Sequence, residues 1–560
     1  MKMKNLMMSG AVALAVAFAA GSAWAQNLSH NLSSTLDLGT GAVSYANVLV
    51  GSNGGSTSTI VDATGTTSFT SNGTQFYVGA HSSNTSIGTL NLGILNTITA
   101  NQLTIGGLEP DANNQTGHAG RVTTAASGTT TINAGNMAVG TGKGNGTLSG
   151  QTGGRFILGS GATLNLYGLT GSDSRANLVV GRWAGFNAHS GNGGMDLSGG
   201  IANLHLSELA VGKVTSSSGG SGNSLTGLLT LGTNASNHLN VSGAGSVVLV
   251  GYNNQSGGNG ITSNGTLTIG NLNSTSSVTS TDNSTAILIG YRGGAGQTAN
   301  GTMNMNGGTL KITTTGTAIQ GAVGTAGGGT STLNLSGGAK LVAGSNSSNW
   351  IHSLSTATIG AGGATIDTDG HDIGISQAFS GAGGLTKSGT GTLTLSGANT
   401  YGGLTSVQDG ALVVNLSLSG NVSVAAGAAF GGSGTVEGDL TLATGAGFVF
   451  NPDIIAAPLT VNGNVSLGDL SVTRLLDWGL SGFDVAVDDV YTLIGGDSSG
   501  WDWGTVDTGI EYAVDIGDNK QAYFQKGSLQ LVVIPEPATG GLLLLGAVAG
   551  LGLLRRKLYG

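Results

Sequence analysis

The sequence of 560 residues contains no cysteine, only five prolines, 8% charged residues and 5% aromatic residues. The absence of cysteine excludes a disulfide framework, so stability must come from backbone pairing and packing. The low aromatic content excludes a large aromatic core. Apart from Arg555, Arg556 and Lys557 at the C-terminus, the 18 basic residues form no concentrated basic face, so we expect no nucleic-acid partner.

Glycine is the abundant residue, with 105 copies, and short aliphatic clusters recur between the glycines. A disordered chain of this length would be poorer in aliphatic residues and richer in proline and charge. Many short strands separated by turns are therefore the structure that this composition favours.

A loose repeat runs from about Thr66 to Gly344. In each copy an apolar cluster ends in glycine, and a Gly/Ser/Asn stretch then leads to an alternating strand such as Gly301-Thr-Met-Asn-Met305. Alternate apolar residues indicate a strand with one face buried. Strands this short must stack on one another, with Gly and Asn at positive-φ corners between them. The terminal glycines of the clusters are Gly79, Gly106, Gly140, Gly181, Gly212, Gly251 and Gly290.

A parallel β-solenoid is the simplest fold that meets these requirements. The alternative is an array of β-sandwiches of the same composition, although sandwiches use longer strands with more aromatic residues between their sheets.

The N-terminus has the features of a secretory signal peptide. Lys2 and Lys4 precede an apolar run from Ala11 to Ala20, and the small residues Ala23 and Ala25 then precede Gln26. We expect export through the Sec machinery and cleavage before Gln26. A first-helix membrane anchor is the competing interpretation, but no charged stop follows the run.

The C-terminus has three consecutive features. Pro535-Glu536-Pro537 excludes a helix, because each proline lacks an amide donor. The uncharged stretch from Ala538 to Leu554 could form a short membrane-spanning helix. The basic residues Arg555, Arg556 and Lys557 would then stay on the cytoplasmic side.

This tail resembles the PEP-CTERM sorting signal of proteins exported by Gram-negative bacteria. The resemblance implies that a membrane transpeptidase of the exosortase type recognises and removes it after transient anchoring in the inner membrane. The alternative is a plain C-terminal anchor, for which Pro535, Glu536 and Pro537 would have no use.

The most regular stretch is Thr356 to Leu412. Its run from Gly381 to Leu412 resembles the passenger-associated β-strand repeat of autotransporters, which implies turns of a right-handed β-helix. In such turns we expect Leu385, Leu393 and Leu395 to face the core, with Leu404 and Val407 beginning the next turn. Asn399 would lie at a turn and Lys387 would be solvated.

Beyond Asn451 the composition changes, because 12 of the 27 acidic residues fall between Asn451 and Ile534. This region also contains Trp478, Trp501 and Trp503, and it reads as a β cap that closes the open end of a solenoid. Stacking of these tryptophans on sugar rings is the functional alternative.

The densest polar segment is Asp367-Thr-Asp369-Gly370-His371-Asp372, whose aspartates could ring a calcium ion. Ala378 stands where a calcium loop has its bidentate glutamate, so we predict no metal site. The histidines at 30, 81, 118, 189, 205, 238, 352 and 371 show no metal-ligand spacing and are interpreted as scattered surface residues.

Together these observations predict an all-β protein: a right-handed parallel β-helix with a C-terminal β cap and one short C-terminal transmembrane helix. The expected divisions are 1–25 signal peptide, 26–355 irregular solenoid, 356–450 autotransporter-like repeat, 451–533 acidic cap and 534–560 sorting signal. We expect a structural protein or adhesin of the cell surface or biofilm matrix, associated with extracellular polysaccharide, without cofactor or catalysis. The alternative is a β-helix polysaccharide lyase or hydrolase, which would need clustered carboxylates.

Overall fold

The structure is a computed structural model that describes residues 26–536. Short internal stretches are excepted, at 31–34, 52–58, 80–86, 108–118, 142–146, 149–150, 184–191, 216–223, 255–260, 283, 294–295, 322–327, 451–457, 476, 478–485, 487 and 527. The expected signal peptide and the expected sorting helix with its basic cluster lie outside the described residues. Among those described, no helix is long and apolar enough to cross a bilayer.

The chain divides into two compact units. The first consists of Met1–Asp367 with Gly374–Gln377, and the second of Thr368–Ile373 with Ala378–Gly560. The short strand β30 (Ile373–Ile375) begins in the second unit and ends in the first. Each unit is built from short strands, as the sequence predicts.

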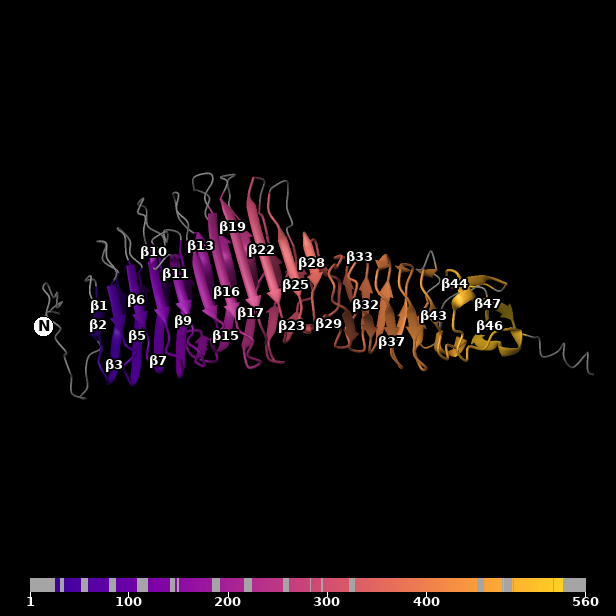
Figure 1. The fold of residues 1–560 in the computed structure, drawn as a ribbon, viewed down its shortest axis with the longest axis horizontal. Coiled ribbons are helices and arrows are strands. Elements are labelled where there is room, and N and C mark those ends of the chain that lie inside the picture. Colours follow the sequence, from indigo (N-terminus) through magenta and orange to yellow (C-terminus); the bar gives the residue numbers. More distant parts are fainter. Residues whose placement is uncertain are drawn as a thin grey trace, which may run out of the picture. The chain divides into compact units, whose positions relative to one another are not determined.

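In the first unit successive turns of the chain stack in parallel, which makes a β-solenoid with three stacks of strands (Figure 1). Stacks 1 and 2 share long strands that run through both: β3 (Ala42–Val50), β5 (Ser68–Val78), β7 (Leu95–Ile105), β9 (Thr129–Val139) and β15 (Ile201–Val214). β1 (Gln26–His30) pairs with β3.

The remaining strands of the unit belong to one stack each. Stack 1 has β12 (Thr163–Tyr167), β17 (His238–Gly243), β20 (Ser277–Ser280), β23 (Thr309–Thr313), β26 (Ala339–Ala343) and β29 (Ala364–Asp367). Stack 2 has β13 (Ala176–Trp183), β18 (Val248–Asn253), β21 (Ile287–Ile289), β24 (Ile319–Gln320) and β27 (Ser347–His352).

Stack 3 is a parallel sheet of one strand per turn: β2 (Thr35–Asp37), β4 (Thr59–Asp62), β6 (Ile87–Asn91), β8 (Ala119–Thr123), β11 (Gln151–Ile157), β14 (Gly193–Leu197), β16 (Ser224–Leu231), β19 (Thr262–Ile269), β22 (Thr298–Met305), β25 (Ser331–Leu335) and β28 (Thr356–Ile359). The two-residue β10 (Thr147–Leu148) pairs antiparallel with β11. Burial alternates along β16, β19, β22, β25 and β28, so that Leu267 and Ile269 of β19 face the core while Thr266 and Thr268 face outward. The predicted period of two is confirmed.

Glycines fix the corner between stacks 2 and 3. The seven glycines that end the apolar clusters form a first glycine column, with φ between 61° and 76°. They face a second glycine column in stack 3, where a Cβ on any member would come within 2.2–2.6 Å of the backbone nitrogen of its partner. The two backbones are therefore in contact at these positions, where there is room for the hydrogen atom of a glycine but not for a Cβ atom. The second column is Gly88, Gly120, Gly154, Gly193, Gly227, Gly265 and Gly301.

The second unit is itself built from turns of three short strands each. One stack holds β31 (Leu385–Ser388), β34 (Thr405–Val407), β37 (Val422–Val424), β40 (Leu440–Leu442) and β43 (Val465–Ser466). The next holds β32 (Thr392–Leu395), β35 (Ala411–Val414), β38 (Ala429–Gly431) and β41 (Gly447–Val449). The third holds β33 (Ala398–Asn399), β36 (Ser417–Leu418), β39 (Thr435–Val436) and β42 (Leu459–Val461).

Within the autotransporter-like repeat the three predicted core leucines, Leu385, Leu393 and Leu395, are buried as expected. The expectation for Lys387 is wrong, because its side chain is completely buried. Its Nζ donates hydrogen bonds to the carbonyl oxygens of Ser388, Gly389 and Asp409, at 3.0, 2.6 and 2.9 Å. The ammonium group therefore satisfies backbone acceptors of two adjacent turns inside the solenoid, which a solvated lysine could not do.

Asn399 is also buried, and it lies in β33 rather than in an exposed turn. Its Oδ1 accepts a hydrogen bond from the amide of Phe379 at 3.0 Å, and its Nδ2 donates to the carbonyl of Gly397 at 2.9 Å. Leu404 precedes β34 and is half exposed, whereas Val407 within β34 is buried.

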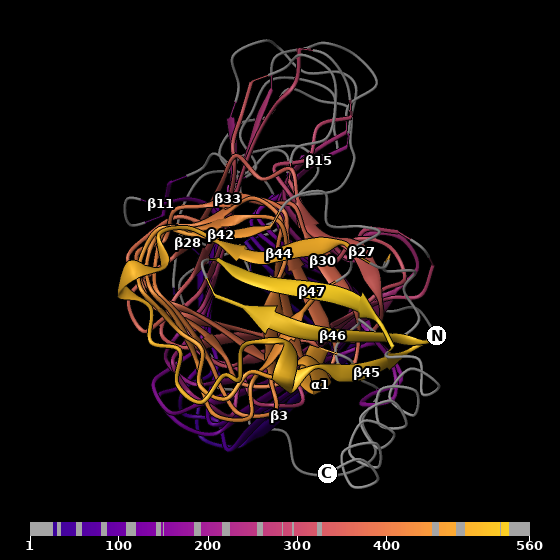
Figure 2. The same cartoon turned by 90° about the vertical axis from the view of Figure 1, so that its right-hand side faces the viewer.

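The last part of the second unit is an antiparallel sheet of β44 (Val490–Gly495), β47 (Leu529–Pro535), β46 (Lys520–Gln525) and β45 (Val514–Gly517), in that spatial order (Figure 2). The same part of the chain contains one four-residue helix, α1 (Val472–Leu475). It also contains two 3-10 turns, η2 (Ser498–Gly500) and η3 (Ile510–Tyr512). The segments 490–494 and 527–533, whose sequences predict the clearest strands of this region, correspond to β44 and β47.

Candidate interaction surfaces

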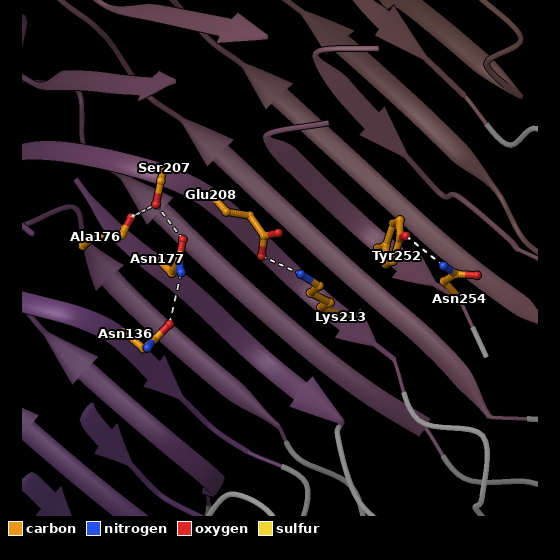
Figure 3. A network of polar contacts seen from close by, with 8 residues as sticks. All are labelled: Asn136, Ala176, Asn177, Ser207, Glu208, Lys213, Tyr252 and Asn254. Atoms are coloured by element: carbon orange, nitrogen blue, oxygen red, sulfur yellow. Dashed lines mark hydrogen bonds and ion pairs between the residues drawn. The ribbon is translucent and has the colours of Figure 1, made fainter. Parts of the chain in front are cut away.

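The outer surface of stack 2 carries a network of polar side chains from successive turns (Figure 3). Asn177 Nδ2 donates to Asn136 Oδ1 at 3.1 Å, and the Ser207 hydroxyl donates to Asn177 Oδ1 at 2.6 Å. Further along β15, Lys213 Nζ lies 2.5 Å from Glu208 Oε1. Because this carboxylate is held by a lysine of its own strand, it is poorly placed to act as a general base.

A pair of tyrosines follows on the next turns, where Tyr252 is paired in register with Lys213. Tyr252 and Tyr291 are stacked, with ring centroids 4.9 Å apart and ring planes 12° from parallel. They cover a cluster of buried aliphatic side chains that includes Leu249 and Leu288. Burial raises the pKa of Tyr252. Since the rings face each other, they stabilise adjacent turns and leave no free ring face between them for a sugar.

A second aromatic row lies on the outer surface of stack 1. The ring centroids of Tyr167 and His205 are 4.9 Å apart, and those of His205 and His238 are 5.1 Å apart. Burial lowers the pKa of His205, with smaller contributions from His238 and Arg175. These two histidines are therefore members of an ordered row, which corrects their interpretation as scattered surface residues.

Stack 3 carries an uncharged polar array on the outer surface of β16, β19, β22, β25 and β28, which are side by side in Figure 1. Its first ladder joins Thr268, Asn304, Asn334 and Thr358 through hydrogen bonds of 3.2, 2.8 and 2.6 Å. Its second ladder joins Ser224, Asn264, Asn300 and Thr330 in the same way. Between the ladders runs a threonine column of Thr266, Thr302, Thr332 and Thr356, paired in register.

Two aspartates of the candidate calcium loop interact with other residues of the chain. Asp367 Oδ2 lies 2.6 Å from Lys340 Nζ, and Asp372 Oδ1 accepts the amide hydrogen of Thr392 at 2.8 Å. Asp369 and Gly370 take positive φ values of 47° and 84°, as a tight corner requires. Within the described residues no group of three or more His, Asp or Glu is placed to hold a metal ion.

Two of the three tryptophans in the acidic region are described. Trp501 is buried, and its ring centroid lies 5.8 Å from that of Trp503. Lys526 Nζ lies 5.6 Å from the Trp503 ring centroid. A buried indole and an indole beneath an ammonium group are typical of packing in the cap and poorly suited to stacking on sugars.

The described part of the candidate sorting motif begins at the end of the cap sheet. Pro535 is the last residue of β47, opposite Lys520, and is exposed. The amide of Glu536 donates to the carbonyl of Asn519 at 2.8 Å. Pro537, Arg555, Arg556 and Lys557 lie outside the described residues, as do Ala23 and Ala25, whereas Gln26 begins β1.

Comparison with known proteins identifies one family and one relative. Residues 385–414 match the model of the passenger-associated-transport-repeat, which agrees with the resemblance seen in the sequence. Over 93 residues the chain is 36% identical to the adhesin BmaC autotransporter of Brucella suis biovar 1 (strain 1330). That alignment covers 16% of this chain and 3% of the relative, so the two proteins share a segment only. No solved structure matches.

Proposed function

We propose that the protein is an exported surface protein of a Gram-negative bacterium that acts as an adhesin or as a structural part of the extracellular matrix of a biofilm. The observation that carries this proposal is the passenger repeat at 385–414, which occupies stacked solenoid turns of the second unit. The similar segment of a protein named as an adhesin supports it. A right-handed winding of these turns is part of the proposal.

The route to the surface is proposed from the two ends of the chain. The Sec machinery would export it and a signal peptidase would cut before Gln26. The short C-terminal helix would then hold it in the inner membrane until an exosortase-type transpeptidase acts at Pro535-Glu536-Pro537. The exposure of Pro535 and Glu536 at the end of the cap sheet supports access by such an enzyme.

The role that we propose is non-catalytic. Glu208 is engaged by Lys213, Asp367 by Lys340 and Asp469 by Arg474, so these carboxylates serve as structural partners. The partner outside the cell is proposed to be an extracellular polysaccharide or another cell surface.

Deletion of the gene tests the proposal. The mutant should lose surface attachment or aggregation while it keeps the breakdown of a panel of polysaccharides, and antibodies should label the protein on intact wild-type cells. Loss of polysaccharide breakdown with normal attachment would instead favour a lyase or hydrolase. Detection of the protein in the cytoplasm alone would contradict export.

A further inference from the structure

The threonine column of stack 3 differs in its hydrogen bonding from the two ladders beside it. The amides and hydroxyls of the two flanking ladders are joined from turn to turn, so their side chains are held in place. By contrast, the side-chain hydroxyls of Thr266, Thr302, Thr332 and Thr356 make no hydrogen bond to any other described residue. The array therefore presents four outward hydroxyls at fixed positions.

The spacing of these hydroxyls is set by the backbone. The four threonines are opposite one another in a parallel sheet without register shifts, so they repeat at about 4.8 Å, the distance between neighbouring strands. A partner that uses all four must have the same repeat. A second copy of this chain carries the same four threonines and therefore has the same repeat.

A hydroxyl both donates and accepts a hydrogen bond, so a threonine column is complementary to itself. The column lies in the middle of the array, with one ladder on each side. A two-fold axis in the plane of the array, running either along the column or across it, would therefore place the column of one copy against the column of the second. This is the condition for an isologous contact between identical chains.

The distribution of charged residues also favours a second copy of this chain as the partner. The chain has a net charge of −9, so two copies repel one another over most of their surface. The outward residues of β16, β19, β22, β25 and β28 are Ser, Thr and Asn with Leu228, and none is charged. Charged outward residues of stack 3, such as Arg155 and Asp196, occur on the preceding strands.

We infer that the polar array of stack 3 is a self-association surface through which two copies of this protein pair face to face. Pairing of copies on neighbouring cells would join the cells, so the inference names a partner for the adhesive role proposed above. Its biological use rests on that role, but the pairing itself is a property of the purified chain.

The absence of cysteine makes a direct test possible, because one introduced cysteine is unique in the chain. Thr302→Cys in the full-length chain should form an interchain disulfide under mild oxidation. Thr97→Cys is the matched control, since Thr97 is an outward threonine of β7 in stacks 1 and 2. Equal cross-linking of both variants, or of neither, would overturn the inference.

A charge variant supplies the second measurement. Thr302→Arg should weaken self-association in sedimentation experiments roughly tenfold or more, because it places like charges in contact. Thr97→Arg should leave association unchanged, and circular dichroism should show that both variants keep the wild-type fold. A wild-type chain that stays monomeric, or whose array binds a neutral polysaccharide instead, would overturn the self-pairing. If that monomeric chain still attaches cells, the proposed function stands without the pairing.

Discussion

Gly193 of β14 lies so close to Gly181 of β13 that a Cβ atom on Gly193 would come within 2.4 Å of the Gly181 backbone nitrogen. The same Cβ would lie 1.9 Å from the carbonyl oxygen of Val139. This approach recurs in every turn along the two glycine columns. The corner between stacks 2 and 3 therefore depends on residues that contribute no side chain.

We expect Gly193→Ala to destabilise its turn by about 3 kcal/mol, because neighbouring backbone cannot move aside without breaking its own hydrogen bonds. Gly194→Ala is the control from the same strand. Its Cβ would meet only Arg155 Nη1, at 3.6 Å, and should change stability by less than about 0.5 kcal/mol. Solenoids open locally, so hydrogen exchange at β13 and β14 is the appropriate measurement. Equal protection in the two variants would contradict this role.

We expect Lys387→Met to destabilise the second unit by about 2 kcal/mol or more. The methionine would fill similar space but leave three backbone carbonyl oxygens without their ammonium donor. Lys340→Met is the control, since it removes a partly exposed ion pair with Asp367 and should cost less than about 1 kcal/mol. Thermal denaturation followed by circular dichroism compares the two, and similar shifts in Tm would argue against a special role for Lys387.

Acid should weaken the first unit through His205. Its pKa is lowered from the usual 6.5, first by burial and then by His238 and Arg175, so the neutral imidazole is favoured in the folded chain. The resulting stability is present above pH 6.5 and is lost as the pH falls through the lower folded-state pKa. His205→Gln should flatten this part of the stability profile. An imidazole titration by NMR with a midpoint above 6.5 would refute the assignment.

The tail offers a prediction that separates sorting from simple anchoring. Replacement of both Pro535 and Pro537 by alanine should trap a full-length, membrane-bound precursor, because the recognition turn is lost while Arg555, Arg556 and Lys557 remain. Pro458→Ala controls for the loss of a proline elsewhere. Mass spectrometry of the C-terminal peptide gives the answer, and intact Leu558-Tyr-Gly560 on wild-type extracellular protein would exclude processing.

The sequence was sufficient to predict the strands and the first glycine column, which forms one side of the corner between stacks 2 and 3. Alternation in segments such as Gly301-Thr-Met-Asn-Met305 depends on local burial alone, and the first glycine column follows from the apolar clusters that end in glycine. Asparagine proved a minor corner residue, because only Asn519 among the described asparagines has a positive φ. The sequence could not reveal that Gly301 must be a glycine, since the backbone atoms nearest to its Cβ would be the carbonyl oxygen of Val250 and the nitrogen of Gly290, which are distant in sequence.

Lys387 and the threonine column illustrate the same limit. The charge of a lysine suggests exposure, although alternation along β31 places Lys387 on the same face as the buried Leu385. The three carbonyl oxygens around its Nζ show why it can be buried there. Likewise, Thr266 and Thr268 are equivalent in sequence. Both face outward, and the hydrogen bond that Asn304 of the next turn donates to Thr268 Oγ1 is what distinguishes Thr268 from Thr266.

The position of β47 determines how the cap would carry a mechanical load. β47 is the last described strand before the tail, and it is hydrogen-bonded to β44 on one side and β46 on the other. Antiparallel hydrogen bonds run perpendicular to the strands, so tension applied along β47 through Glu536 loads both sets in shear at once. In a protein held by its C-terminus, the strand where force enters would thus be secured by hydrogen bonds on both of its edges.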